Sequence, residues 1–218
     1  MPSVIPCPSC QEDVSVQAIQ CEKCGESLNE VPDCVKVSVI EDLRDDDLPG
    51  YLFQYAIAYL DQNGCYKIGG PPDREILAKL PRGIRVGYTL NLLNGEVSNG
   101  GFYQWFTNSS GQITHETLDD LRLIGASDHV RVVGEAMTLI ECLEVKYPRF
   151  KNRWDDTRET CVWDKSLDAF WEEVNSEYRP AFDSLSEEFY TLEDTNSMWP
   201  LFVKYVRQHV NELAHQRG

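Results

Sequence analysis

Four cysteines near the start of the chain carry the clearest chemistry in the sequence. Cys7 and Cys10 form one C-x2-C pair, and Cys21 and Cys24 form a second pair after a ten-residue spacer. Each pair presents two thiolates from one tight turn, and two such pairs complete a tetrahedral shell of four sulfurs. Gly25 follows the last cysteine, where a knuckle of this kind uses a positive φ angle. The spacing therefore predicts a zinc ion held by these four cysteines.

The predicted zinc is structural, because four protein thiolates leave no open position for a catalytic water. Residues 1–30 are too few to bury a core sufficient for folding, so the metal supplies the folding energy. Residues 1–40 hold two lysines and six acidic residues, which argues against a nucleic-acid-binding ribbon. A thiol redox pair is the alternative, although no βαβ pattern of the thioredoxin type surrounds these cysteines. Among the remaining cysteines, Cys142 is expected in a core.

The charge of the chain restricts its partners. The 218 residues include 20 Lys and Arg against 36 Asp and Glu, a formal net charge of −16. Such a chain is repelled by nucleic-acid phosphates and by anionic lipids, so a basic protein is the favoured partner. The longest apolar stretch, at residues 51–60, contains Gln54 and is too short to span a membrane. The N-terminus has no secretory pattern, and we expect a cytoplasmic protein.

Downstream of the cysteines, apolar residues recur with helical periodicity. We therefore predict an all-α main domain of about eight helices, preceded by a small N-terminal zinc ribbon with four cysteine ligands. The predicted boundaries are a zinc ribbon at 1–30, an acidic linker or bridging segment at 31–47 and a helical domain at 48–218. Helices are expected at 49–62, 73–80, 81–94, 99–106, 114–124, 127–145, 166–178 and 197–215. Asn94 and Gly95 are expected to end one helix, and Pro180 is expected to interrupt another.

One motif stands out in the helical region, EVSNGGFYQWF at residues 96–106. Gly100 and Gly101 fall in the first turn of a predicted helix, where each glycine costs about 1 kcal/mol relative to alanine. Such a pair indicates either the close approach of another backbone or a ligand or partner at the helix N-terminus. Phe102 begins an apolar face, and Gln104 is placed to hydrogen-bond a buried carbonyl.

The search for catalytic motifs finds little. HETLD at residues 115–119 differs from the zincin motif because Asp119 stands where the second histidine is required. No nucleotide-binding glycine motif or nucleophile elbow is present. An enzyme that uses an unrecognised carboxylate cleft stays as an alternative, and we expect no catalytic residues.

The strings SNGGFYQWF, LNLLNGEV and TLDDLRLIGA resemble the DNA-mimic protein family, a bacterial all-α domain of otherwise unknown function. The resemblance covers residues 48–218 and is carried by Asn99, Gly100, Gly101, Phe102 and Gln104. It implies an all-α domain and a homodimer. For the namesake of the family, it also implies an acidic surface that occupies the DNA site of a transcriptional regulator.

A mimic of DNA needs dense carboxylates on one surface. Residues 155–194 hold thirteen acidic residues against three basic ones. The predicted partner surface comprises Asp155, Asp156, Glu159, Asp164, Asp168, Glu172, Glu173, Glu177, Glu187 and Glu188. We expect a non-enzymatic interaction protein that occupies the DNA-binding site of a basic regulator or nucleoid protein. The alternatives are a solvated acidic face and a zinc-ribbon adaptor or antitoxin-like module for a specific protein.

Overall fold

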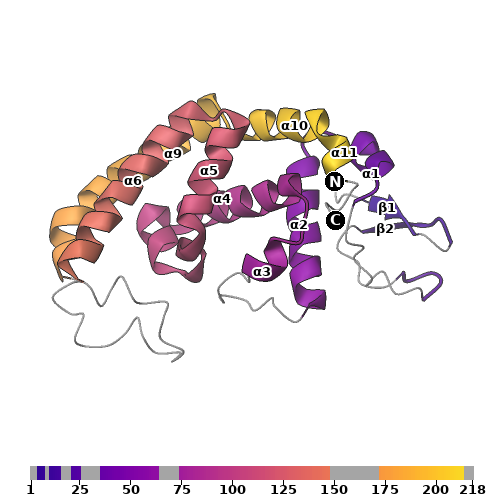
Figure 1. The fold of residues 1–218 in the computed structure, drawn as a ribbon, viewed down its shortest axis with the longest axis horizontal. Helices are drawn as coiled ribbons and strands as arrows, with labels where there is room; N and C mark the ends of the chain where they lie inside the picture. Colours follow the sequence, from indigo (N-terminus) through magenta and orange to yellow (C-terminus); the bar gives the residue numbers. More distant parts are fainter. Residues whose placement is uncertain are drawn as a thin grey trace. The chain divides into compact units, whose positions relative to one another are not determined.

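The computed structural model is mainly helical, with a small two-stranded sheet near the N-terminus (Figure 1). It describes residues 4–7, 10–15, 21–25, 35–63, 74–147 and 172–213. The chain divides into two compact units. One comprises residues 1–68, 72–91 and 202–218, and the other comprises residues 69–71 and 92–201. Within the described residues, no helix combines the length and apolar character needed to cross a membrane.

The first unit contains the predicted ribbon. Strands β1 (Val4–Pro6) and β2 (Asp13–Ser15) pair antiparallel, with Ile5 opposite Val14. The backbone N–H of Cys7 donates to the carbonyl of Glu12 at 2.8 Å, which closes the hairpin beside the first cysteine pair. The hairpin therefore places the first C-x2-C pair at the end of a short sheet.

In the helical part of the first unit, helices pack closely at a glycine, which has no side chain to keep them apart. Its helices are α1 (Val37–Asp42), α2 (Leu48–Gln62), α3 (Arg74–Leu77), the first part of α4 (Arg82–Thr107), the end of α10 (Trp199–Gln208) and α11 (Val210–Leu213). A Cβ atom at Gly87 would lie 3.0 Å from Phe202 and 3.3 Å from Leu52. Gly87 thus lets α4 approach both α2 and α10.

Helix α1 lies inside the predicted linker segment and is tied to α10. Arg207 donates hydrogen bonds to the carbonyl oxygens of Ile40 and Leu43, at the C-terminal end of α1. It also pairs with Asp45 at 2.7 Å. A cation at a helix C-terminus satisfies carbonyls that have no helical partner. The described part of this segment is therefore held to α10 by hydrogen bonds.

The second unit contains the remainder of α4, the 3-10 helix η1 (Ser109–Ile113), α5 (Thr114–Ile124), α6 (Ser127–Lys146), the π-helical turn η4 (Val174–Tyr178) and α9 (Arg179–Thr195). Helix α6 packs against both α5 and α9, and α6 and α9 run side by side in Figure 1. Gly125 ends α5 in the left-handed conformation, with φ 81°. The core of this unit buries five aromatic rings, those of Phe102, Trp105, Phe106, Phe182 and Phe189.

The all-α prediction is confirmed, and the helices expected at 49–62, 114–124 and 127–145 are present. One expected helix end is wrong, because Gly95 lies inside α4, which instead breaks at Gly100 and Gly101. The helical segment expected to end near Tyr178 does end there, but α9 follows directly. Pro180 stands in the first turn of α9, where the backbone N–H that proline lacks has no partner within the helix.

The expectation for Cys142 is also wrong, because this residue is exposed on α6. Its helix turns Ile140 and Leu143 inward instead. Cys34, Cys65 and Cys161 lie outside the described residues, as does the start of the helix expected at 166–178. The predicted domain boundaries stay predictions.

Candidate functional site

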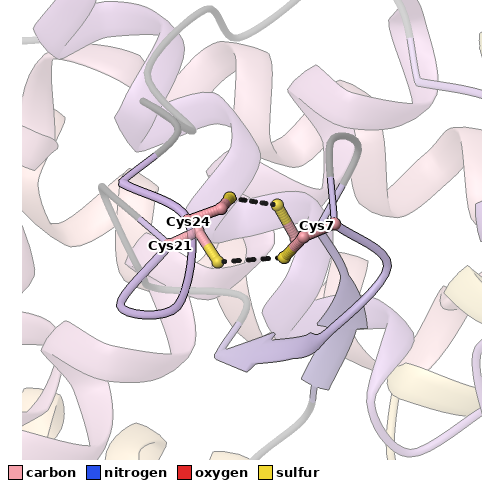
Figure 2. A group of neighbouring side chains, drawn as sticks. Cys7, Cys21 and Cys24 are labelled. Carbon is pink, nitrogen blue, oxygen red and sulfur yellow. Dashed lines mark hydrogen bonds between the residues drawn. The ribbon is translucent and has the colours of Figure 1, made fainter.

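The four predicted metal ligands come together in the structure. The sulfur atoms of Cys7, Cys10, Cys21 and Cys24 all lie within 4.8 Å of one another. Cys7 and Cys24 are 3.6 Å apart, as are Cys10 and Cys21, so each contact joins one C-x2-C pair to the other (Figure 2). Four sulfurs around a zinc ion, each about 2.3 Å from it, stand about 3.8 Å from one another. The cluster therefore fits a tetrahedral metal ion.

The backbone turns back after each cysteine pair through a residue with a positive φ angle, and these two turns are the knuckles of the ribbon. Gly25 has φ 72°, as predicted, and its N–H donates to the carbonyl of Cys21 at 2.8 Å. Gln11 has φ 63°, the same left-handed conformation after the first pair, and its N–H donates to the carbonyl of Cys7 at 2.9 Å. The sequence reveals the first of these turns through its glycine. It gives no such signal for Gln11, because non-glycine residues seldom adopt a positive φ.

Cysteines form most of the core among the described residues of the ribbon. Cys7 and Cys21 are fully buried, Cys10 is half-buried, and Val14 is the buried apolar side chain beside them. Cys24 is exposed. Burial is the largest cause that raises the pKa of the Cys10 thiol. A bound dication counters such a rise, because it stabilises the thiolate form that coordinates it.

The Gly-Gly motif forms a break within α4. Gly101 has φ 73°, and a Cβ atom there would lie 2.7 Å from the hydroxyl oxygen of Ser186. The backbone N–H of Phe102 donates to that hydroxyl at 3.0 Å, and the hydroxyl donates to the carbonyl of Phe182 at 2.7 Å. Gly101 therefore allows a buried serine of α9 to satisfy a backbone group of α4.

A second side chain of α9 supports the other side of the break. The Tyr190 hydroxyl donates to the carbonyl oxygen of Val97 at 2.7 Å. Ser186 and Tyr190 are four residues apart and share one face of α9. Burial raises the pKa of Tyr190, and the nearby Glu187 adds to the rise, so the phenol keeps the proton that it donates.

The exposed side of the break is closed by a carboxylate that the sequence analysis did not single out. Glu96 accepts hydrogen bonds from Gln104 at 2.8 Å, Asn108 at 2.7 Å and Ser110 at 2.9 Å. Asn99 in turn donates to Gln104 at 3.1 Å. Asn99 and Gln104 therefore belong to a polar network within the chain. The sequence feature that could have indicated Glu96 is its position one helical turn before Gly100.

A protein-family model described as DMP19-like protein matches residues 78–209. This range covers more than half of the chain and includes the helix break. The chain belongs to the DMP19-like protein family. No curated protein and no solved structure shows significant similarity to it.

In this DMP19-like chain, the predicted acidic residues differ in what they contact. Asp155, Asp156, Glu159, Asp164 and Asp168 lie outside the described residues. Glu172, Glu177 and Glu187 are exposed. Glu173 is bonded to Lys146 and Tyr147, and these bonds lower the pKa of its carboxyl. Glu188 pairs with Arg131 of α6. Glu173 and Glu188 are therefore already paired with side chains of the same unit, Glu188 at the surface.

Helix α9 exposes a row of acids that becomes visible only once the helix itself is known. Asp183, Glu187 and Asp194 are all exposed, and their spacing places them on one side of the helix. Asp183 is also bonded to Arg179 at 3.3 Å. No cation among the described residues pairs with Glu187 or Asp194. We call Asp183, Glu187 and Asp194 the α9 acidic row.

The histidines of the DMP19-like chain do not form a zincin site among the described residues. His115 is exposed at the start of α5, and Asp119 pairs with Arg122 at 2.8 Å. His129 is buried and contacts Glu193 at 2.7 Å, a pair that no sequence pattern indicated. Glu193 also accepts from the backbone N–H of Met198 at 3.2 Å, so this pair joins α6 to the end of α9.

Proposed function

We propose that this DMP19-like chain is a non-enzymatic interaction protein whose acidic surface occupies the DNA-binding site of a basic protein. Family membership and the net charge of −16 support the proposal. The observation that carries the proposal is the α9 acidic row. Its carboxylates are exposed on one side of α9, while other side chains of the same helix pack into the core and bond to α4. Carboxylates on a fixed helix present charge without the entropy cost of ordering a flexible segment.

The contacts of α9 explain why its charges are held in place. Phe182 and Phe189 are fully buried, and Ser186 and Tyr190 bond to the broken helix α4. These contacts determine the rotation of α9 about its own axis. A rotation of one residue, about 100°, would change which side chains face solvent.

We further propose that Cys7, Cys10, Cys21 and Cys24 hold a structural zinc ion. The sulfur spacing and the four-thiolate donor set support zinc, which is common in closed sites of this type. The metal would supply folding energy that the described core of the ribbon, two buried cysteines and Val14, does not provide. It would leave no position open for catalysis.

The first experiment is affinity capture from a native lysate with the zinc-loaded chain. The beads are washed at about 50 mM and then about 500 mM salt, and a parallel sample is eluted with duplex DNA. A mimic releases a DNA-binding protein both in high salt and with DNA, because the captured site is the DNA site. A captured protein that resists both salt and DNA would contradict mimicry and support the adaptor alternative.

A triple variant locates the binding surface. Asp183→Asn, Glu187→Gln and Asp194→Asn together remove three charges from the α9 acidic row, and we expect the affinity for the captured protein to fall about tenfold at low salt. The matched control removes three exposed charges from the other unit, through Glu41→Gln, Asp42→Asn and Asp46→Asn. Equal losses in both variants would show a general charge effect and contradict a site on α9.

A further inference from the structure

We propose that the cysteine cluster is a site of reversible oxidation by a peroxide, which converts Cys7 and Cys24 into a disulfide and releases the metal. The inference rests on the proposed zinc site and adds a reaction to it. It starts from the unequal exposure of four cysteine residues whose sulfur atoms share one centre. Cys24 is exposed, Cys10 is half-buried, and Cys7 and Cys21 are buried.

The most exposed cysteine is the one that a peroxide reaches first. A thiolate reacts with a peroxide in proportion to its charge and its accessibility. Metal coordination keeps all four cysteines as thiolates, so accessibility is the difference among them. Cys24 is therefore the point of attack.

A sulfur of the other cysteine pair, in contact with Cys24, then completes the reaction. Cys7 lies 3.6 Å from Cys24, and the contact is drawn in Figure 2. The Cys24 thiolate attacks one oxygen of hydrogen peroxide, which breaks the O–O bond, forms a sulfenic acid and releases hydroxide. The Cys7 thiolate then attacks the Cys24 sulfur, which forms the S–S bond and displaces a second hydroxide. Two sulfurs lose two electrons in total, the peroxide gains them, and two protons convert the hydroxides to water.

The consequence for the ribbon follows from its core. The new disulfide removes two of four ligands, and Cys10 and Cys21 alone bind zinc weakly. Because Cys7 and Cys21 are buried with Val14 as the core, the ribbon loses its organising centre. The helical part of the chain keeps its aromatic core. Oxidation therefore acts on the ribbon alone.

The test uses the full chain, loaded with zinc and assayed for metal content before any oxidant is added. Hydrogen peroxide is then added, zinc release is followed with a colorimetric chelator, and the thiols are trapped by alkylation for peptide mass spectrometry. We expect one zinc released per chain, a Cys7–Cys24 disulfide as the first product, and recovery of zinc binding after reduction.

Two matched variants test the order of attack. Cys24→His offers an imidazole ligand in place of the exposed thiolate, so we expect peroxide-driven zinc release to slow about tenfold or more. Cys10→His makes the same change at the half-buried position and should leave the Cys7–Cys24 disulfide as the product. Zinc content before oxidation is measured for both, so a variant that fails to bind metal is recognised as such.

Three results separate the proposals. A chain that holds no zinc before oxidation overturns the zinc site and, with it, this inference. A zinc-loaded chain whose first disulfide joins Cys21 to Cys24, or Cys10 to Cys21, overturns only the inference. So does a chain that retains its zinc at a peroxide concentration that oxidises the exposed Cys142.

Discussion

Among the described residues, the ribbon buries Cys7, Cys21 and Val14, whereas the second unit buries five aromatic rings together with many aliphatic side chains. Burial of one large apolar side chain contributes about 1.5–3 kcal/mol. The described part of the ribbon therefore buries too little apolar area to offset the entropy of folding, whereas the described helical body buries enough. We propose that the two regions reach order by different means, metal coordination in the first and apolar burial in the second.

The contrast also applies to polar groups. In the ribbon, we propose that the buried thiols coordinate a cation. In the helical body, a side chain of α9 forms a hydrogen bond with the backbone on each side of the α4 break. Ser186 and Tyr190 replace helical hydrogen bonds that Gly100 and Gly101 interrupt. The proposed metal ion would satisfy the thiols of the ribbon, whereas a distant helix of the same chain satisfies the backbone groups at the α4 break.

The largest expected effect separates the two regions. Cys21→Ser removes a fully buried ligand, and we expect complete loss of the folded ribbon, because three ligands do not replace its core. Amide peaks of residues 4–25 should lose their dispersion in NMR spectra, while helical circular dichroism is retained. Chelation of the metal should give the same result. Loss of helical signal in either sample would show that the regions fold as one and would contradict the comparison.

Gly101→Ala tests the helix break. The positive φ angle and the 2.7 Å approach to Ser186 leave no room for a methyl group, and we expect a loss of about 2–4 kcal/mol in the free energy of unfolding. Denaturant unfolding measures this loss, with zinc content unchanged. Gly95→Ala is the matched control, because a Cβ atom there meets nothing within 4 Å in the same helix. It should be neutral or stabilise by up to about 1 kcal/mol. Equal effects at both glycines would contradict a special role for the break.

Ser186→Ala removes the hydroxyl and leaves the buried N–H of Phe102 without its acceptor. We expect a loss of about 1–3 kcal/mol in the free energy of unfolding. Hydrogen exchange at Phe102 should accelerate more than exchange in α5. Thr191→Ala, at an exposed position of the same helix, is the control and should cost less than about 0.5 kcal/mol. Unchanged exchange at Phe102 would disprove the hydrogen bond.

The smallest expected effect depends on pH. Lys146 and Tyr147 lower the pKa of Glu173, so its folded-state pKa lies below the unfolded value of about 4.3. Its stabilising contribution is therefore present above about pH 4.3 and is lost as the pH falls through the folded-state pKa. Melting temperatures of the parent chain and Glu173→Gln should differ slightly at pH 7, and the difference should shrink as the pH falls through the folded-state pKa of Glu173. A difference that stays constant as the pH is lowered would contradict an electrostatic origin.

Residue spacing predicts much of this molecule. The four-cysteine cluster follows from two C-x2-C pairs, because each pair forms within one turn of the backbone. Helices α2, α5 and α6 follow from apolar periodicity and from breakers at their ends. The end expected at Gly95 fails, since one glycine costs about 1 kcal/mol and packing of α4 outweighs it. Helix α9 is not predicted from the sequence, because proline breaks a helix when it lies in the interior but is favoured in the first turn. The sequence pattern around Pro180 did not distinguish these two positions.

The sequence alone determined the four-cysteine cluster, the helical class and the excess of acidic residues, because each depends on residues a few positions apart or on composition. The tertiary structure decided which carboxylates face solvent and which are bonded internally. It also decided the role of Gly101, which lies against Ser186 of α9; Ser186 is 84 positions along the chain from Phe102, the residue from whose N–H it accepts a hydrogen bond. Contacts at that separation depend on how α4 and α9 pack, and packing is a property of the whole core rather than of any local pattern.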